Sequence, residues 1–283
     1  MNYRHGYHAG SFTDVFKHAI LVSLIKSLLH KDTAICYLDT HAGAGYYDLF
    51  AEAAQKSKEF ETGITKIVHE KNPPSLLKQY LSCVQRINVR LSGSTISSLR
   101  YYPGSPSIMR YFLRTQDHMI LTELHPQEYQ ILKDDFAGNK HTSIHLLDGY
   151  QGLKAFLPPK ERRGLILIDP PYERPNELAY IPSILPSVVK RFATGVYAIW
   201  YPIKERTAID HFWRSLRENV KQPILVTELS IYPENSPLHL NGCGMAIINP
   251  PWQLDKQILD YLPWLWKVLS IHKQGQYQVL PLN

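Results

Sequence analysis

Residues 165–172 read LILIDPPY, and this stretch decides the predicted fold. A run of four residues, all Leu or Ile, is typical of a strand that is buried on both faces of a parallel sheet. The run stops at Asp169, and the two prolines after it cannot extend the strand. The stretch therefore predicts a central parallel strand whose carboxyl end leads into a rigid loop.

Carboxylates also end the three strands predicted before it. These are residues 34–38, ending at Asp39, residues 118–122, ending at Glu123, and residues 143–147, ending at Asp148. Glu123 and Asp148 lie 25 positions apart, and Asp148 and Asp169 lie 21 apart, which is one strand–helix–strand step in each case. A single aspartate at such a place usually caps the next helix. Four in register are expected to converge on one crevice, where open α/β sheets bind ligands.

The rest of the chain predicts a doubly wound α/β sheet. A helix is expected at residues 14–30, where apolar residues recur at helical spacing and Asp14 can cap the start. Later strands are expected at residues 196–200, 224–231 and 245–248. The segment 233–242 between the last two is rich in turn residues, so we expect a hairpin and an antiparallel edge of the sheet.

One connection is too long for a simple crossover. The gap from Asp39 to Glu123 spans 84 positions, whereas a complete βαβ unit needs roughly 30 residues. Part of the excess has helical patterns with Lys and Arg interspersed, as at residues 75–87. We therefore expect a main domain of residues 1–52 and 101–283 and an inserted helical subdomain of residues 53–100.

The loop after the first strand suits a nucleotide-containing cofactor. Gly43 and Gly45 allow its backbone to approach a ligand closely. Glu123 is placed to hold two ribose hydroxyls, as in cofactors of either the NAD or the S-adenosylmethionine type. The pattern GxxxxGK[ST] of phosphate-binding loops does not occur, so phosphoryl transfer has little support.

The tetrapeptide at residues 169–172 favours a cofactor of the S-adenosylmethionine type over one of the NAD type. The exocyclic amine of an adenine is a poor nucleophile because its lone pair is delocalised into the ring. The Asp169 carboxylate and the Pro170 carbonyl can each accept one of its N–H groups, which directs the lone pair at a methyl electrophile. The Tyr172 ring offers a flat face on which a base can stack. We predict Asp169, Pro170 and Tyr172 as the catalytic residues.

A second tetrapeptide of the same type, NPPW, occupies residues 249–252. It follows the strand 245–248, which we assign to the antiparallel edge of the sheet. A strand that runs in the opposite direction delivers its end to the opposite side, away from the crevice. We therefore interpret residues 249–252 as a structural turn.

Composition and charge indicate what kind of partner the protein binds, whether it holds a metal, and in which compartment it lies. The net charge is +6 and the isoelectric point about 9.0, which is compatible with a polyanionic partner. The three cysteines lack the spacing of a zinc site or a disulfide framework, and the histidines lack HExxH spacing, so we expect no metal. The polar start of the chain and its short apolar stretches predict a cytoplasmic protein.

Several longer motifs resemble one family, the large-subunit ribosomal RNA adenine-N6 methyltransferases called J. They are YRH at residues 3–5, HAG at 8–10, DVFKH at 14–18, LDTHAGAG at 38–45, YYPGSP at 101–106, TELHP at 122–126 and RRGLILIDPPY at 162–172. The similarity covers nearly the whole chain, although residues 51–95 resemble the family less closely.

The resemblance implies a class I, Rossmann-like methyltransferase fold that uses S-adenosylmethionine to methylate adenine N6 in large-subunit (23S) ribosomal RNA. It implies catalysis by Asp169 and an N-terminal segment that contacts the target base or its RNA through Tyr3, His5 and Lys17. It also implies a cofactor site lined by His18, His41, Ser105, Glu123, Asp148, Gly149 and Asp169, to which the loop adds Gly43.

Other interpretations stay open at this point. The same chemistry would serve a DNA adenine or a protein glutamine amide, and a catalytically silent RNA-binding scaffold could keep the fold. An NAD oxidoreductase would leave the tetrapeptide unexplained. Because no feature demands a dimer, we expect a monomer. The candidates for contacts with RNA phosphates are Arg86, Arg90, Arg100, Arg110 and Arg114.

Overall fold

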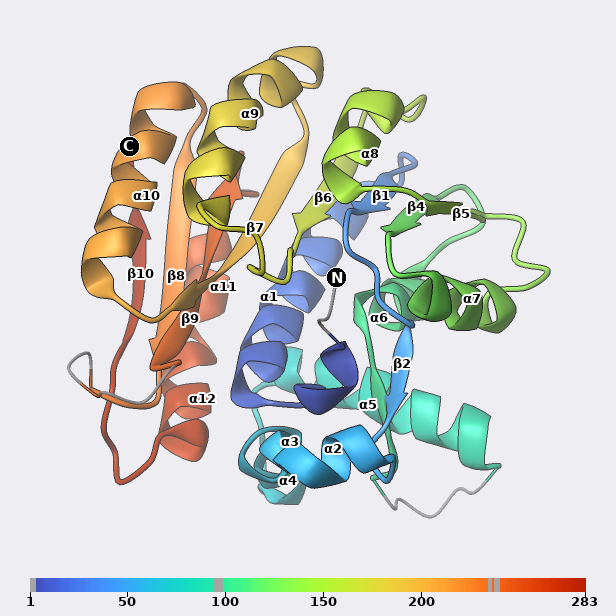
Figure 1. Cartoon of the computed structure of the whole chain (residues 1–283), viewed down its shortest axis with the longest axis vertical. Helices are drawn as coiled ribbons and strands as arrows, with labels where there is room; N and C mark the ends of the chain where they lie inside the picture. Colours follow the sequence, from blue (N-terminus) through green and yellow to red (C-terminus); the bar gives the residue numbers. More distant parts are fainter. Residues whose placement is uncertain (1–3, 94–98, 234–235, 237–239) are drawn as a thin grey trace.

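Five neighbouring parallel strands form one side of an eight-stranded sheet with the order β10-β8-β9-β7-β6-β1-β4-β5 (Figure 1). The computed structural model describes residues 4–93, 99–233, 236 and 240–283. The parallel strands are β1 (Cys36–Asp39), β4 (His118–Glu123), β5 (Thr142–Leu146), β6 (Gly164–Ile168) and β7 (Val196–Ile203). These are the strands expected from the apolar runs, and the Rossmann-like α/β class is confirmed.

The register of these strands brings their carboxyl ends together. Asp39 of β1 pairs with Leu121 of β4 on one side and with Leu167 of β6 on the other. Glu123 and Asp169 therefore lie two residues beyond the positions paired with Asp39. The predicted crevice forms at this end of the sheet.

The antiparallel part of the sheet differs from the prediction in one respect. Strand β9 (Gly242–Ile248) runs antiparallel between β7 and β8 (Ile224–Ser230), so our assignment of residues 245–248 to the edge is wrong. All residues of β9 are buried, as expected for an internal strand of a sheet that is covered on both faces. The antiparallel edge strand is β10 (Tyr277–Pro281), which the sequence did not reveal because its residues are only half-buried or exposed.

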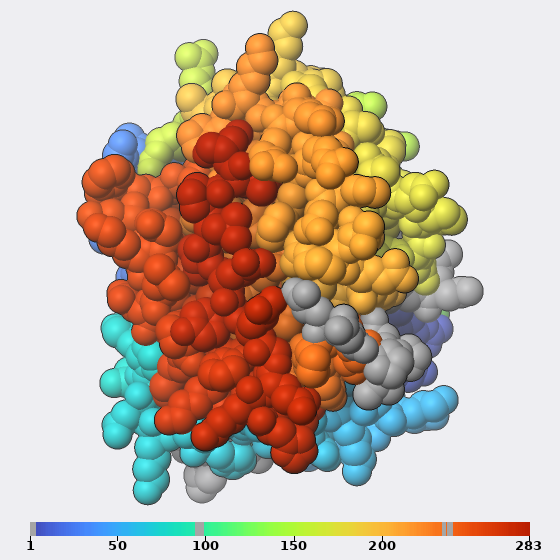
Figure 2. All heavy atoms as spheres, turned by 90° about the vertical axis from the view of Figure 1, so that its left-hand side faces the viewer, coloured from blue at the N-terminus to red at the C-terminus, as the bar shows by residue number. Residues whose placement is uncertain are grey.

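Helices cover both faces of the sheet. One face carries α1 (Phe12–Leu29), α6 (Ser105–Phe112), α11 (Leu254–Leu259) and α12 (Leu262–Leu269), and α7 (Pro126–Asp135) packs beside β4 and β5. The other carries α8 (Gly149–Phe156), α9 (Glu177–Arg191) and α10 (Arg206–Asn219). Seen from the antiparallel side, the C-terminal residues lie at the surface beside the orange α10 segment (Figure 2).

Helix α1 starts two residues earlier than expected, and its predicted cap is wrong. The cap is Ser11, whose Oγ accepts a hydrogen bond from the Asp14 backbone N–H at 3.5 Å. Asp14 lies inside the first turn, so its carboxylate is free for other contacts. None of the helices in the described ranges is long and apolar enough to cross a bilayer.

The long connection between β1 and β4 is largely helical. It contains β2 (Tyr46–Asp48), α2 (Glu52–Ser57), α3 (Glu59–Thr62), α4 (Ile64–His69), α5 (Ser75–Ser92) and β3 (Tyr101–Pro103), and β2 pairs with β3. The helices lie below the sheet in Figure 1, next to the short 3-10 helix η1 (His5–Tyr7). Ile64 and Tyr80 belong to the same core cluster as α1. The subdomain boundary at residues 53–100 stays a proposal.

Candidate active site

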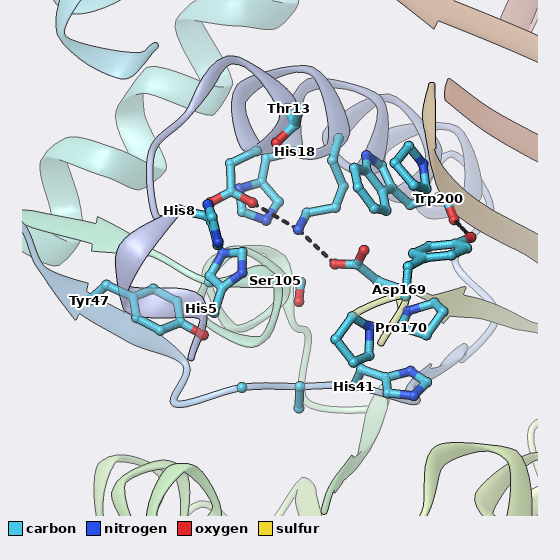
Figure 3. A pocket seen from close by; sticks show the side chains of 18 of the residues that line it. His5, His8, Thr13, His18, His41, Tyr47, Ser105, Asp169, Pro170 and Trp200 are labelled. Atoms are coloured by element: carbon cyan, nitrogen blue, oxygen red, sulfur yellow. Dashed lines mark hydrogen bonds and ion pairs between the residues drawn. The ribbon is translucent and has the colours of Figure 1, made fainter. Parts of the chain in front are cut away.

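A cavity of about 420 Å³ lies where the carboxyl ends of β1, β4, β6 and β7 meet (Figure 3). Its lining comes from the N-terminal segment 5–18, the loop 41–43, the starts of α6 and α7, the tetrapeptide 169–172 and the end of β7. A cavity of this volume accommodates a small organic molecule. Loop residues that are far apart in the sequence therefore share one enclosed space.

The tetrapeptide presents two hydrogen-bond acceptors that no described residue occupies. Asp169 Oδ2 accepts a hydrogen bond from Lys17 Nζ at 2.6 Å, whereas Asp169 Oδ1 has no donor among the described residues. The carbonyl of Pro170, a buried residue, likewise has no donor in the described part of the chain. Adjacent acceptors on a rigid loop suit a planar group that carries two N–H bonds.

Tyr172 is held in a fixed position at the cavity wall. Its backbone has a φ of 53°, in the left-handed region, and its hydroxyl donates to the Trp200 carbonyl within β7. The two aromatic rings meet edge to face, with centroids 5.7 Å apart and planes at 62°. Trp200 lines the cavity as well. The loop after β6 is thereby tied to the neighbouring strand.

Lys17 joins the N-terminal helix to the tetrapeptide through a buried ion-pair network (Figure 3). Its ammonium also contacts Asp14 Oδ1 at 2.8 Å, and Asp14 Oδ2 contacts His5 Nε2 at 2.9 Å and accepts from the Gly10 backbone N–H at 3.0 Å. Burial by itself would lower the pKa of Lys17, but the charges of Asp14 and Asp169 hold it above its ordinary value. Lys17 is therefore a fixed cation.

The network also keeps Asp14 ionised. Burial would raise the pKa of the Asp14 carboxyl, yet His5 and Lys17 hold that pKa well below its usual value. The predicted substrate residues His5 and Lys17 are thus brought together around one carboxylate. Tyr3, the third of them, lies outside the described residues.

The glycine loop and Glu123 form the other end of the cavity. Gly43 has a φ of +62°, and a Cβ there would lie 2.1 Å from the Tyr47 hydroxyl, so the position requires glycine. Glu123 Oε2 accepts the Gly43 N–H at 2.8 Å and Oε1 accepts the His125 N–H at 2.7 Å. Each carboxylate oxygen keeps a second acceptor site, which suits a pair of ligand hydroxyls.

Asp39 lies beneath the cavity and orients Ser105. Asp39 Oδ2 accepts hydrogen bonds from Ser105 Oγ at 2.7 Å and from Tyr37 Oη at 2.8 Å. Burial raises the pKa of the Asp39 carboxyl to about 6, against the opposing effect of these donors. Ser105 lines the cavity, whereas Asp39 is fully buried behind it.

The two histidines predicted at the cofactor site both line the cavity and are neutral at pH 7. Burial lowers the pKa of His18 well below its ordinary value, and its Nδ1 lies 2.7 Å from the Tyr102 hydroxyl. Burial lowers the pKa of His41 to about 4. Both side chains therefore add hydrogen-bonding capacity without charge.

Two predicted residues do not line the cavity. Asp148 Oδ1 caps α8 by accepting the Tyr150 and Gln151 N–H groups, and its Oδ2 pairs with Arg174 at 2.5 Å. Gly149 packs so closely on the first loop that a Cβ would lie 2.1 Å from the Thr40 carbonyl oxygen. The cofactor-binding role of Asp148 and Gly149 stays a prediction.

The arginines proposed for RNA contacts are engaged within the protein. Arg90 and Arg110 both pair with Asp135 at 2.6 Å, and Arg100 and Arg114 pair with Asp48 and Asp117. Arg86 lies over the Tyr111 ring. Four of the five are therefore paired with a carboxylate, and two of these four, Arg90 and Arg110, share one carboxylate. Within the described ranges, no group of three or more His, Cys, Asp or Glu side chains is placed to hold a metal ion.

Sequence reasoning missed Asp14 and Trp200. The sequence indicates a helix cap at Asp14, whereas the structure shows its carboxylate in contact with Lys17. Trp200 was detectable in principle, because it ends the predicted strand 196–200 at the same edge of the sheet as the carboxylates.

Known proteins resemble this chain over almost its whole length. A profile of the family described as "Ribosomal RNA large subunit methyltransferase D, RlmJ" matches residues 32–281. A ribosomal RNA large subunit methyltransferase J from Escherichia coli (strain K12) is 44% identical over 265 residues, 94% of this chain and 92% of that protein. The protein of the same description from Haemophilus influenzae is 38% identical over 279 residues, 99% of this chain and 98% of that one.

Solved structures agree with the sequence similarity. The crystal structure of a protein from Legionella pneumophila has a TM-score of 0.86 at 36% identity, over 96% of this chain and 98% of that one. A probable spermidine synthase from Corynebacterium glutamicum has a TM-score of 0.51 at 8% identity, over 94% and 81% of the two chains, which shows a similar fold alone.

Proposed function

The chain belongs to the RlmJ family of ribosomal RNA large-subunit methyltransferases, and on that premise we propose how its cavity modifies RNA. The protein is an enzyme that transfers a methyl group from S-adenosylmethionine to an adenine of large-subunit (23S) ribosomal RNA. We propose that the acceptor atom is the exocyclic N6, and that Asp169 and Pro170 hold it. The observation that carries the proposal is the pair of acceptors at residues 169 and 170 to which no described residue donates.

The residues of the cavity fit this cofactor. The spare acceptor sites of Glu123 suit the two ribose hydroxyls, and the glycine-only position 43 leaves room for a close approach of the ligand to the backbone. Ser105 and the neutral histidines 18 and 41 add polar groups to the same wall. When bound, S-adenosylmethionine supplies a methyl group on a positively charged sulfonium, which is an electrophile for a nitrogen lone pair.

The chain's own residues then orient the substrate. A target adenine turned out of the RNA stack enters the cavity, as in enzymes that act on a single base. Asp169 Oδ1 and the Pro170 carbonyl each accept one amine N–H, and this takes the lone pair out of conjugation with the ring. Tyr172 and Trp200 flank the base with aromatic surface.

Lys17 positions the catalytic carboxylate. Its hydrogen bond to Asp169 Oδ2 fixes the rotation of the carboxylate, so that Oδ1 is the oxygen left for the amine. His5 and Asp14 hold Lys17 in turn. We propose that the N-terminal segment, including Tyr3, contacts the target nucleotide.

We further propose a cytoplasmic monomer. Its three cysteines are buried free thiols, as expected in a reducing compartment.

A product analysis tests the function. Wild type, Asp169→Ala and, as a control, the exposed Asp255→Ala would be incubated with labelled S-adenosylmethionine and unmodified large-subunit ribosomal RNA. The RNA is then digested to nucleosides and analysed by mass spectrometry. We expect N6-methyladenosine from the wild type and Asp255→Ala, and none from Asp169→Ala. Label in DNA or protein but not in RNA would contradict the proposal.

A further inference from the structure

A second hollow, of about 640 Å³, adjoins the catalytic cavity. It lies between the segment that leads from β6 into α9 and the start of α10. Tyr172, Pro202 and Lys204 line both the hollow and the catalytic cavity. A molecule that extends beyond the catalytic cavity on this side therefore enters the hollow, which we call the α9–α10 groove.

The wall of the groove contains a buried acceptor without a donor. Glu177 is 3% exposed and lines the groove, and its Oε1 accepts a hydrogen bond from Tyr150 Oη at 2.9 Å. Its Oε2 has no hydrogen-bond partner among the described residues. A buried carboxylate oxygen without a donor is costly. A ligand with an N–H group would satisfy it, and the apolar side chains of Ile209 and Phe212 complete the wall.

Lys204 is the free cation at the boundary between the two spaces. It is exposed, it lines both of them, and it forms no ion pair with any residue in the described ranges. Arg174, which also lines the groove, is already paired with Asp148. Glu205 lines the groove too and opposes an anion there. Attraction for a phosphate is therefore concentrated at Lys204, with the exposed His211 further along the groove.

We propose that the α9–α10 groove binds the nucleotide next to the target adenosine in the RNA strand. Lys204 contacts the phosphate that links the two nucleosides, because that phosphate lies between the two spaces. The Glu177 side chain turns its buried Oε2 toward the groove and accepts an N–H from the edge of the neighbouring base, as carboxylates do from cytosine N4. Glu177 is thus a specificity-determining residue. The proposal rests on the proposed function and names a subsite of that reaction.

The phosphate contact is tested by the salt dependence of methylation. For Lys204→Ala, we expect kcat/KM on transcribed large-subunit ribosomal RNA to fall about tenfold. The slope of its logarithm against log salt should become shallower by about 1. Affinity for S-adenosylmethionine should not change, and Lys204→Arg should restore most of the loss. The control is Lys221→Ala, an exposed lysine beyond the opposite end of α10. An unchanged salt slope in Lys204→Ala would refute the phosphate contact.

The base contact is tested with mutated RNA. Once the methylated adenosine is mapped, the nucleotide on each side is replaced in turn by the other three. Wild type should discriminate among the bases at one of the two positions, and Glu177→Gln should reduce that discrimination about tenfold. Glu218→Gln, at an exposed position on α10, should leave it unchanged. Equal discrimination by wild type and Glu177→Gln would exclude base recognition by Glu177.

These tests distinguish a failure of the groove proposal from a failure of the proposed methyltransferase function. If the wild type transfers no methyl group to the RNA, the proposed function fails and the groove proposal falls with it. If the wild type is active but both the salt slope and the base discrimination are unaffected, only the groove proposal is wrong.

Discussion

Two tetrapeptides of the same type, each with two central prolines, lie at opposite ends of the sheet. DPPY at residues 169–172 follows the parallel strand β6, and NPPW at residues 249–252 follows the antiparallel strand β9. Both contain a residue with a left-handed backbone, Tyr172 with a φ of 53° and Asn249 with a φ of 55°. The left-handed residue is the last of DPPY and the first of NPPW, so the two turns share their prolines but not their backbone geometry.

Their surroundings differ in every respect that matters for chemistry. Asp169 lines a cavity and contacts a buried ammonium. Asn249 Nδ2 instead donates to the carbonyls of Ala193 and Gly195, at 2.9 and 2.8 Å, which ties two loops together. Trp252 is 85% exposed. The direction of the preceding strand, and not the tetrapeptide, decides which copy becomes a site.

The largest expected effect is a difference in kcat between substitutions in the two tetrapeptides. Asp169→Asn keeps the shape of the side chain but replaces one acceptor oxygen with a donor, so we expect kcat to fall about 1,000-fold. Asn249→Ala should change kcat by less than about twofold, because it lies at the other end of the sheet. Single-turnover methylation at saturating RNA and cofactor measures both. A large loss in a folded Asn249→Ala protein would break the comparison.

The second largest effect concerns the stability of the ion-pair network that holds Asp169, which has no counterpart at Asn249 among the described residues. Lys17→Met leaves the buried Asp14 carboxylate without its ammonium partner, which we expect to cost about 3 kcal/mol of unfolding free energy. In Lys17→Met/Asp14→Asn the charge is removed together with its partner, so the loss should be smaller than the sum of the two single losses. Urea denaturation of the four proteins completes the cycle. Strict additivity would contradict the network.

The third effect depends on pH. The pKa of Asp39 is raised to about 6 by burial, so the folded protein binds this proton more tightly than the unfolded chain does. The resulting stability is complete below about pH 4 and is lost as the pH rises through 6. Asp39→Asn should therefore exceed the wild type in stability by up to about 3 kcal/mol at pH 8 and match it near pH 4. Denaturation curves at both values test the sign, and a larger gain at pH 4 would refute it.

The smallest effects belong to the structural copy. Asn249→Ala loses two hydrogen bonds and places Ala at a positive φ, so we expect a loss of about 1–2 kcal/mol with normal activity. Trp252→Ala should change stability by less than about 0.5 kcal/mol, because the side chain is already in water. Thermal unfolding of both variants provides the measurement. A greater loss from Trp252→Ala than from Asn249→Ala would show that the exposed ring has a role we have not assigned.

The parts of the site that depend on strand ends could be predicted from the sequence. Apolar runs located β1, β4 and β6 to within about two residues, and their ends placed Glu123 and Asp169 at one cavity. The prediction that residues 249–252 lie away from the cavity rests on the antiparallel direction of the strand before them. That prediction is confirmed, although β9 is an internal strand and not an edge strand.

The side-chain pairings could not be predicted, because they form only in the folded chain. Lys17 and Asp169 are 152 positions apart, and no local pattern joins them. Asp148 ends a strand as the other carboxylates do, yet it caps α8 and pairs with Arg174. The sequence marks Arg90 and Arg100 as candidates for RNA contacts, whereas the structure pairs them with Asp135 and Asp48. Sequence patterns identify charged residues, but only the structure shows which of them are paired within the protein.

The most direct test of the central claim is a crystal structure with S-adenosylhomocysteine and an RNA that contains the target adenosine. We predict that the adenine amine lies within about 3.2 Å of both Asp169 Oδ1 and the Pro170 carbonyl oxygen. We also predict that Lys17 still contacts Asp169 Oδ2 and that no RNA base contacts residues 249–252. An adenine held in the cavity with its amine directed away from Asp169, or bound at Trp252, would contradict the account.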